Sequence, residues 1–162
     1  MGMDMDMSAP HTMDMSMRNQ ANAPDVKLGP GVDMIAPMPV DRTGDPGLGL
    51  EKTGHRVLTY RDLVSPVQNP DTRAAGREIE MHLTGSMDRY LWSFDGVMMS
   101  EAHHPVTMTT GERLRITLIN DTMMAHPIHL HGHFFELATG HGDRSPRKHT
   151  VTVLPGGKVS FD

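Results

Sequence analysis

The stretch RLRITLIND, residues 113–121, has the pattern of a β-strand with one buried face. Leu114, Ile116 and Leu118 occupy alternate positions, and alternate side chains of a strand point to the same side of a sheet. The segment therefore predicts a strand whose apolar face covers a core.

Similar short segments lie on both sides of this strand. EIEMHL, residues 78–83, also places apolar side chains at alternate positions, and RYLWSF is followed by the turn signal Asp95-Gly96. HTVTVLPGGKVSFD, residues 149–162, predicts a strand, a turn at residues 155–157 and a second strand. Short strands at intervals of about 8–15 residues, separated by turn signals, are typical of an all-β sandwich or barrel without helices of any length. Because a final strand ending at Asp162 would leave an unpaired edge, we expect a fragment of a larger domain.

Composition excludes several classes of function. The net charge of −5 makes a nucleic-acid partner improbable, and no apolar run has the roughly 18 residues needed to span a bilayer. The N-terminus has no signal-peptide pattern. The absence of cysteine excludes disulfides and thiolate metal ligands within the chain, which instead has 16 methionines and 11 histidines.

Residues 1–70 differ in composition and hydrophobic patterning from residues 71–162. They begin with methionines alternating with Asp, Ser and Gly, and continue with a Pro/Gly-rich run. We expect a disordered Met-rich tail and a linker that bury little surface, followed by one β-domain over residues 71–162.

The segment HPIHLHGH, residues 126–133, contains four histidines in eight residues. If it forms a strand, His129 and His131 point to the outer face, about 6–7 Å apart. His126 shares the parity of Ile128 and Leu130 and points to the apolar interior. Neutral imidazole is the commonest metal ligand in proteins, so the spacing predicts a metal site; the alternative is an unselective metal-trapping tract.

A cupin-type metal site is a remote alternative, because His129-x-His131 followed by Glu136 mimics the cupin motif. The glycine that this motif places before the first histidine is missing, and no later segment supplies a second cupin-like histidine motif.

HPIHLHGHFFEL resembles the C-terminal copper-binding motif of multicopper oxidases. LTGSMDRYLWSFDG, GERLRITLINDTMMAHPIHLHGH and RKHTVTVLPGGKVSFD resemble the last cupredoxin domain of the CopA/PcoA-type copper-resistance oxidases. The resemblance implies a cupredoxin-like Greek-key β-sandwich that is C-terminally truncated, with copper as cofactor and a periplasmic location.

The resemblance also implies a role for each histidine. His126 would bind the type 1 copper, His129 the type 2 copper and His131 a type 3 copper, in a parent oxidase that couples oxidation of Cu(I), or of phenols, to reduction of O2 to water. The His-Cys-His segment and the N-terminal cupredoxin domains of such a parent are missing here, so whether this chain is itself an enzyme stays open. The alternative function is a non-catalytic copper-binding or sequestering protein.

Other residues carry weaker expectations. In a copper-resistance context the thioethers of the N-terminal tail are candidate weak Cu(I) ligands. They are Met3, Met5, Met7, Met13, Met15 and Met17. We expect His82, which shares a strand face with Glu78 and Glu80, to be exposed, and Asp121 to accept a hydrogen bond from a ligand histidine.

Overall fold

The computed structural model describes residues 17–103 and 105–162, and these residues form β-strands and short 3₁₀ turns without an α-helix. The strands are β1 (Val40–Asp41), β2 (Arg77–Ser86), β3 (Leu91–Phe94), β4 (Val97–Met98), β5 (Leu114–Asn120), β6 (His126–His129), β7 (Phe135–Glu136), β8 (Arg147–Lys148), β9 (Thr150–Val153) and β10 (Gly157–Phe161). The 3₁₀ turns are η1 (Gln20–Asn22), η2 (Tyr60–Asp62), η3 (Met99–Glu101) and η4 (Gly142–Arg144). The predicted all-β class is confirmed.

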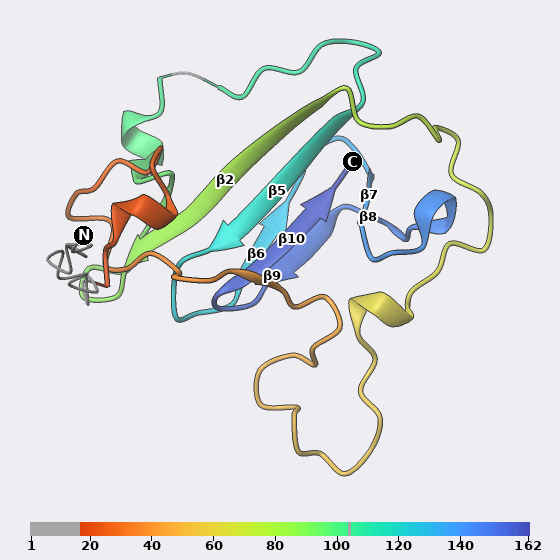
Figure 1. Cartoon of the computed structure of the whole chain (residues 1–162), viewed down its shortest axis with the longest axis horizontal. Coiled ribbons are helices and arrows are strands. Elements are labelled where there is room, and N and C mark those ends of the chain that lie inside the picture. Colours follow the sequence, from red (N-terminus) through yellow and green to blue (C-terminus); the bar gives the residue numbers. More distant parts are fainter. Residues whose placement is uncertain (1–16, 104) are drawn as a thin grey trace, which may run out of the picture.

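The strands form one large sheet and two small ones (Figure 1). The large sheet has the order β1-β10-β5-β2-β3-β4, and the small sheets pair β6 with β9 and β7 with β8. Strands β2 and β5 run parallel, whereas β10 is antiparallel to β5 and parallel to β1. Strands β9 and β10 are consecutive in the sequence but belong to different sheets, so the turn between them crosses from one layer of a cupredoxin-like sandwich to the other.

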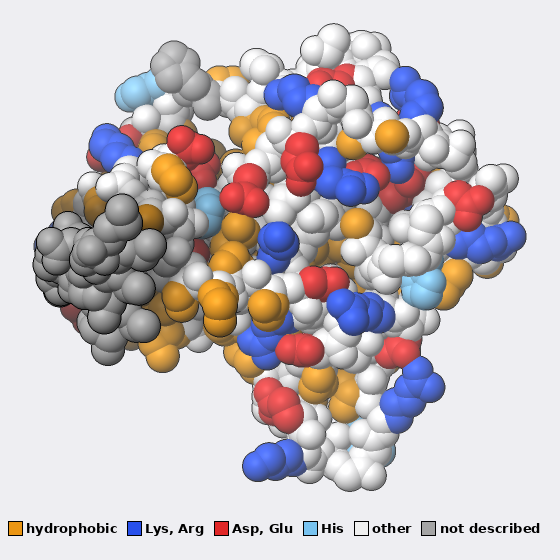
Figure 2. All heavy atoms as spheres, in the orientation of Figure 1, with side chains coloured by type: hydrophobic (Ala, Val, Ile, Leu, Met, Phe, Trp, Pro, Cys, Tyr) orange, Lys and Arg blue, Asp and Glu red, His pale blue; other side chains and the backbone are white. Residues whose placement is uncertain are grey.

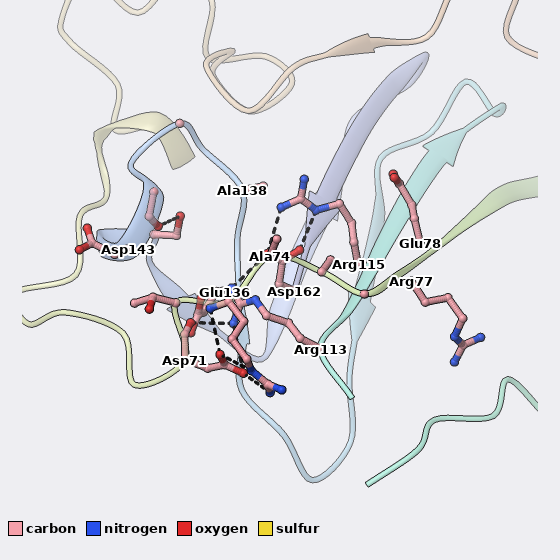
Figure 3. Close-up of a pocket in the computed structure, with 17 residues that line it drawn as sticks. Asp71, Ala74, Arg77, Glu78, Arg113, Arg115, Glu136, Ala138, Asp143 and Asp162 are labelled. Atoms are coloured by element: carbon pink, nitrogen blue, oxygen red, sulfur yellow. Dashed lines mark hydrogen bonds and ion pairs between the residues drawn. The ribbon is translucent and has the colours of Figure 1, made fainter. Parts of the chain in front are cut away.

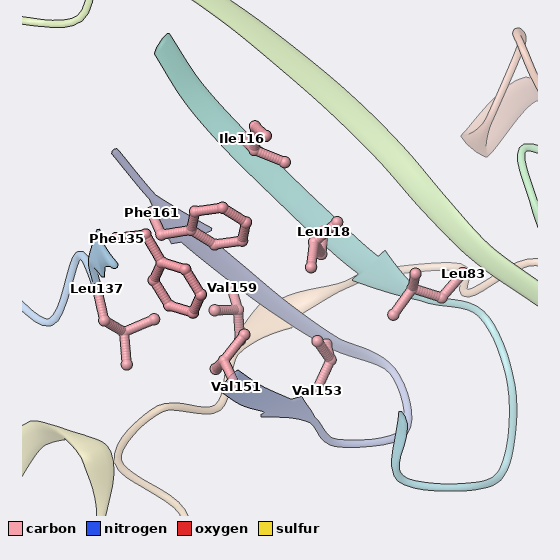
Figure 4. Close-up of a cluster of buried hydrophobic side chains, with 9 residues drawn as sticks. All are labelled: Leu83, Ile116, Leu118, Phe135, Leu137, Val151, Val153, Val159 and Phe161. Carbon is pink, nitrogen blue, oxygen red and sulfur yellow. The ribbon is translucent and has the colours of Figure 1, made fainter. Parts of the chain in front are cut away.

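The hydrophobic core lies between the layers (Figure 4). Its fully or nearly fully buried side chains come from both layers: Leu83, Ile116, Leu118, Phe135, Leu137, Val151, Val153, Val159 and Phe161. Phe135 and Phe161 stack with ring centroids 4.2 Å apart. Leu114, predicted to share the buried face of its strand, packs against this core while partly exposed. Burying one such side chain stabilises the fold by about 1.5–3 kcal/mol.

A second apolar cluster, formed by Ala23, Val26, Val32 and Ile35, involves the segment before β1. The segment is attached to the large sheet by backbone hydrogen bonds from Lys27 N–H to the Asp95 carbonyl and from Asp33 N–H to the Gly85 carbonyl. The expectation that the Pro/Gly-rich run buries little surface is therefore wrong for residues 23–36. The boundary between residues 70 and 71 stays a prediction, and the predicted disorder of the Met-rich tail concerns residues 1–16, which lie outside the described part.

The predicted turn Asp95-Gly96 joins β3 to β4. Both residues have positive φ, 51° and 78°, as a two-residue type I′ hairpin turn requires. A Cβ atom on Gly96 would lie 2.0 Å from the Lys27 carbonyl oxygen, so only glycine permits this contact with the N-terminal segment.

Acidic and basic side chains are interspersed with apolar ones over the face seen in Figure 2. Ion pairs in the described part of the chain include Arg77 with Glu112 and Arg42 with Asp45. Among the described residues, no helix is long and apolar enough to cross a membrane.

Candidate metal centre

Strand β6 carries the first histidines of the cluster and pairs with β9, with His126 opposite Val153 and His129 opposite Thr150. His126 is half-buried, whereas His129 and His131 are exposed, in the alternation that the sequence predicts. The strand ends at His129, and His131 lies in a turn with Gly132, whose φ is 78°. The turn brings the rings of His129 and His131 to 4.9 Å between centroids.

His126 is half-buried beside an aromatic side chain of β3. Its ring packs against Trp92 of β3, with centroids 4.1 Å apart and a tilt of 54°. The Nδ1 atom is buried and has no hydrogen-bond partner in the described structure. Burial lowers the pKa of His126, because desolvation disfavours the charged imidazolium. A neutral ring with a buried, unpartnered nitrogen is suited to a copper ion.

His129 is held by the neighbouring strand. Its Nδ1 lies 2.6 Å from the backbone carbonyl oxygen of His149. Because a carbonyl can only accept, the Nδ1 of His129 carries the proton and the Nε2 is left with a free lone pair. Histidine ligands of metals have this arrangement, with the second ring nitrogen donating to a carbonyl or carboxylate.

The sequence pattern indicates no contact between His149 and the histidine cluster. The Nδ1 of His149 lies 3.4 Å from the Nδ1 of His129, and the two ring centroids are 5.2 Å apart. The pairing of β6 with β9 could have identified it, because His149 directly precedes the strand that lies opposite His129. Within the described residues no group of three His, Cys, Asp or Glu side chains is arranged to hold a metal ion. The exposed histidines therefore offer ligands without completing a coordination shell.

Two expectations about polar residues near the cluster are wrong. His82 is buried, and Asp121 accepts a hydrogen bond from this histidine, 2.7 Å from Nδ1 to Oδ2, rather than from a predicted metal ligand. The other oxygen of Asp121 accepts the Ala36 N–H at 2.9 Å. Burial alone would lower the pKa of His82, but the hydrogen bond and charge of Asp121, helped by Asp95 and Glu80, raise it.

The candidate methionine ligands cannot be placed as a group. Met3, Met5, Met7, Met13 and Met15 lie outside the described residues. Met17 is exposed, and its carbonyl accepts the Ile35 N–H at 2.7 Å.

The cupin alternative fails on the position of Glu136. Its carboxylate accepts from Arg113 at 2.7 Å, in a charged cleft of about 600 Å³ (Figure 3). Asp162 bridges Arg113 and Arg115 in the same cleft, at 3.1 and 2.7 Å. Glu136 is thus neutralised by an arginine instead of joining the histidines in a metal site.

Comparison with known proteins shows which protein family the chain belongs to. The multicopper oxidase family matches residues 72–162, more than half of the chain, so the chain belongs to the multicopper oxidase family, whose cofactor is copper.

Curated relatives of the chain include proteins named for copper resistance. The chain is 53% identical over 132 residues to Copper resistance protein A of Escherichia coli and 50% identical over 132 residues to the protein of that name from Pseudomonas syringae pv. tomato. Each match covers 82% of this chain and 22% of the relative, so the chain spans about a fifth of these relatives' length. Among solved structures, the McoA multicopper oxidase of Aquifex aeolicus is similar with a TM-score of 0.41 and 23% identity, over 65% of this chain and 25% of that one.

Proposed function

We propose that the chain supplies copper ligands of a copper-resistance multicopper oxidase, with His126 at the type 1 copper, His129 at the type 2 copper and His131 at a type 3 copper. The parent protein couples oxidation of Cu(I), or of phenols, to reduction of O2 to water, and works in the periplasm. The single observation that carries the proposal is the division of one short strand into two environments, with the half-buried neutral imidazole of His126 on one face and the exposed imidazole of His129 on the other.

The residues around each histidine support these roles. Trp92 and the interior shield His126 from water, which keeps the ring neutral and its Nδ1 available. His129 keeps Nε2 free because its Nδ1–H is held by a carbonyl. The two histidines lie three positions apart on one strand, about 10 Å at the usual rise per residue, so they can serve two neighbouring copper sites. When bound, copper supplies the one-electron transfers that connect the substrate to O2.

Complete oxidase chemistry needs groups beyond this chain. A type 1 site requires a cysteine thiolate, and the sequence has no cysteine. We propose that the thiolate and the remaining cluster histidines come from other parts of the parent, including its N-terminal cupredoxin domains. A second candidate, copper sequestration without catalysis, is favoured by the exposed histidines and by the exposed Met17, a residue of the candidate Cu(I)-binding tail.

Titration of the purified chain with Cu(II) in a calorimeter tests the proposed ligands. We expect His129→Ala and His131→Ala each to weaken binding strongly, whereas His133→Ala, which removes an exposed histidine from the same segment, leaves it unchanged. Equal affinities in all four proteins would contradict the assignment. Oxygen consumption with Cu(I), measured on the chain alone and on a longer protein containing the missing domains, separates the two candidate functions. Turnover only in the longer protein is expected for the oxidase, and copper binding without turnover in both is expected for sequestration.

A further inference from the structure

We propose that His149 is a positioning residue that fixes the tautomer and ring orientation of His129. The inference rests on the proposed function, since it concerns a ligand of that site, but its geometry is independent of copper. His149 approaches His129 in two ways, through its main-chain carbonyl and through its ring.

The carbonyl of His149 is a fixed acceptor. It accepts the backbone N–H of Leu130 at 3.1 Å as well as the Nδ1–H of His129 at 2.6 Å. Because the first bond continues the pairing between β6 and β9, the sheet itself places the carbonyl beside the His129 ring. The Nδ1–H tautomer of His129 is therefore favoured before any metal binds.

The ring of His149 also favours the Nδ1–H tautomer of His129. Its Nδ1 lies 3.0 Å from the Thr150 hydroxyl and 3.4 Å from the Nδ1 of His129. An imidazole nitrogen has a single lone pair, and in His149 the Nδ1 uses it to accept from the Thr150 hydroxyl. The Thr150 oxygen, 3.2 Å from the Nδ1 of His129, then turns its own lone pairs towards the N–H of His129. The two rings meet edge to face at 87°, a geometry that restricts rotation of the His129 side chain.

The His149 ring is itself held from its other side. Phe134 contacts it edge to face, with centroids 5.6 Å apart and an angle of 77°, and the guanidinium of Arg147 lies 5.8 Å from the centre of the Phe134 ring. A row of side chains thus runs from Arg147 through Phe134 and His149 to His129. His133, also exposed and four residues from His129, has no hydrogen bond or ring contact within the described residues, which makes it a matched control.

The test compares the whole chain with His149→Ala, His149→Asn, which keeps an acceptor near the Nδ1 position, and His133→Ala. Imidazole ¹⁵N spectra of the metal-free proteins report the tautomer of His129. His149→Ala keeps the backbone carbonyl, so we expect the Nδ1–H form to stay the major one in all four proteins. A measurable Nε2–H fraction should appear in His149→Ala only, and His149→Asn should suppress it again. Loss of a positioning partner of a metal-binding histidine typically weakens metal affinity about 10–100-fold, so Cu(II) binding should fall by that factor in His149→Ala only.

The outcomes separate the two proposals. An unchanged His129 tautomer and unchanged Cu(II) affinity in His149→Ala would overturn the positioning role, even if His129→Ala and His131→Ala abolish binding. If those two variants bind copper normally, the proposed ligands are wrong, and the metal-free spectra still decide the role of His149. Backbone amide spectra check the fold of each variant, and His149→Asn keeps the tautomer test informative if His149→Ala unfolds.

Discussion

Replacing Asp121 by Asn removes a buried charge without a large change in shape. Asp121 is 1% exposed, and its two oxygens accept from the Nδ1 of His82 at 2.7 Å and from the Ala36 N–H at 2.9 Å. The amide of Asn can still accept the Ala36 N–H through its oxygen, but it then turns an NH₂ group towards the donor on His82. The substitution therefore weakens one contact and leaves the other in place.

The expected loss of stability follows from the lost hydrogen bond between Asp121 and His82. A hydrogen bond that involves a charged group contributes about 1.5–3 kcal/mol, so Asp121→Asn should lower the free energy of unfolding by about that amount at pH 6. Glu80→Gln is the control, because Glu80 is exposed and lies 3.7 Å from His82 Nε2, where an ion pair contributes at most about 1 kcal/mol. Urea unfolding followed by the fluorescence of Trp92, the single tryptophan of the chain, measures both variants.

The cost of Asp121→Asn should depend on pH. Because Asp121 raises the pKa of His82 in the folded state, the stabilisation is fully present below the unfolded value of about 6.5 and is lost as the pH rises through the raised value. The difference in unfolding free energy between wild type and Asp121→Asn should accordingly be largest near pH 6 and shrink towards pH 9. A difference that grows with pH, or one no larger than that of Glu80→Gln at pH 6, would refute the reasoning.

Two further predictions concern the fold. Leu118→Ala removes a core side chain that is 2% exposed and should lower the free energy of unfolding by about 2–5 kcal/mol in the same urea assay; a loss as small as that expected for the exposed Leu58→Ala would contradict its place in the core. Gly96→Ala should destabilise the chain more than Gly111→Ala, because both glycines have positive φ but only at Gly96 would the new Cβ meet another backbone atom, and equal melting temperatures for the two variants would count against that contact.

The sequence predicted the features that depend on local alternation. Leu114, Ile116 and Leu118 of β5 pack in or against the core as expected, and so do Met81 and Leu83 of β2. The two orientations of His126 and His129 follow from the same period of two. The Asp95-Gly96 turn was predicted from its residue types, because few dipeptides tolerate two positive φ angles in succession.

Features that depend on distant segments were not predicted. Glu78, Glu80 and His82 share one face of β2, yet only His82 is buried, because segments far away in the sequence cover that end of the strand. Alternation identifies the two faces of a strand but not what covers the second face. The contact of His149 with His129 depends likewise on the register between β6 and β9, which the sequence pattern does not specify.

The position of β10 has a consequence for the order in which the chain can fold. This strand lies between β1 and β5, so residues 40–41 pair with the large sheet only through residues 157–161. On the ribosome, β1 and one edge of β5 therefore remain unpaired until residues 157–161 have left the exit tunnel. Because unpaired strand edges can pair with other chains, we expect a chain without residues 157–161 to aggregate more readily than the intact chain.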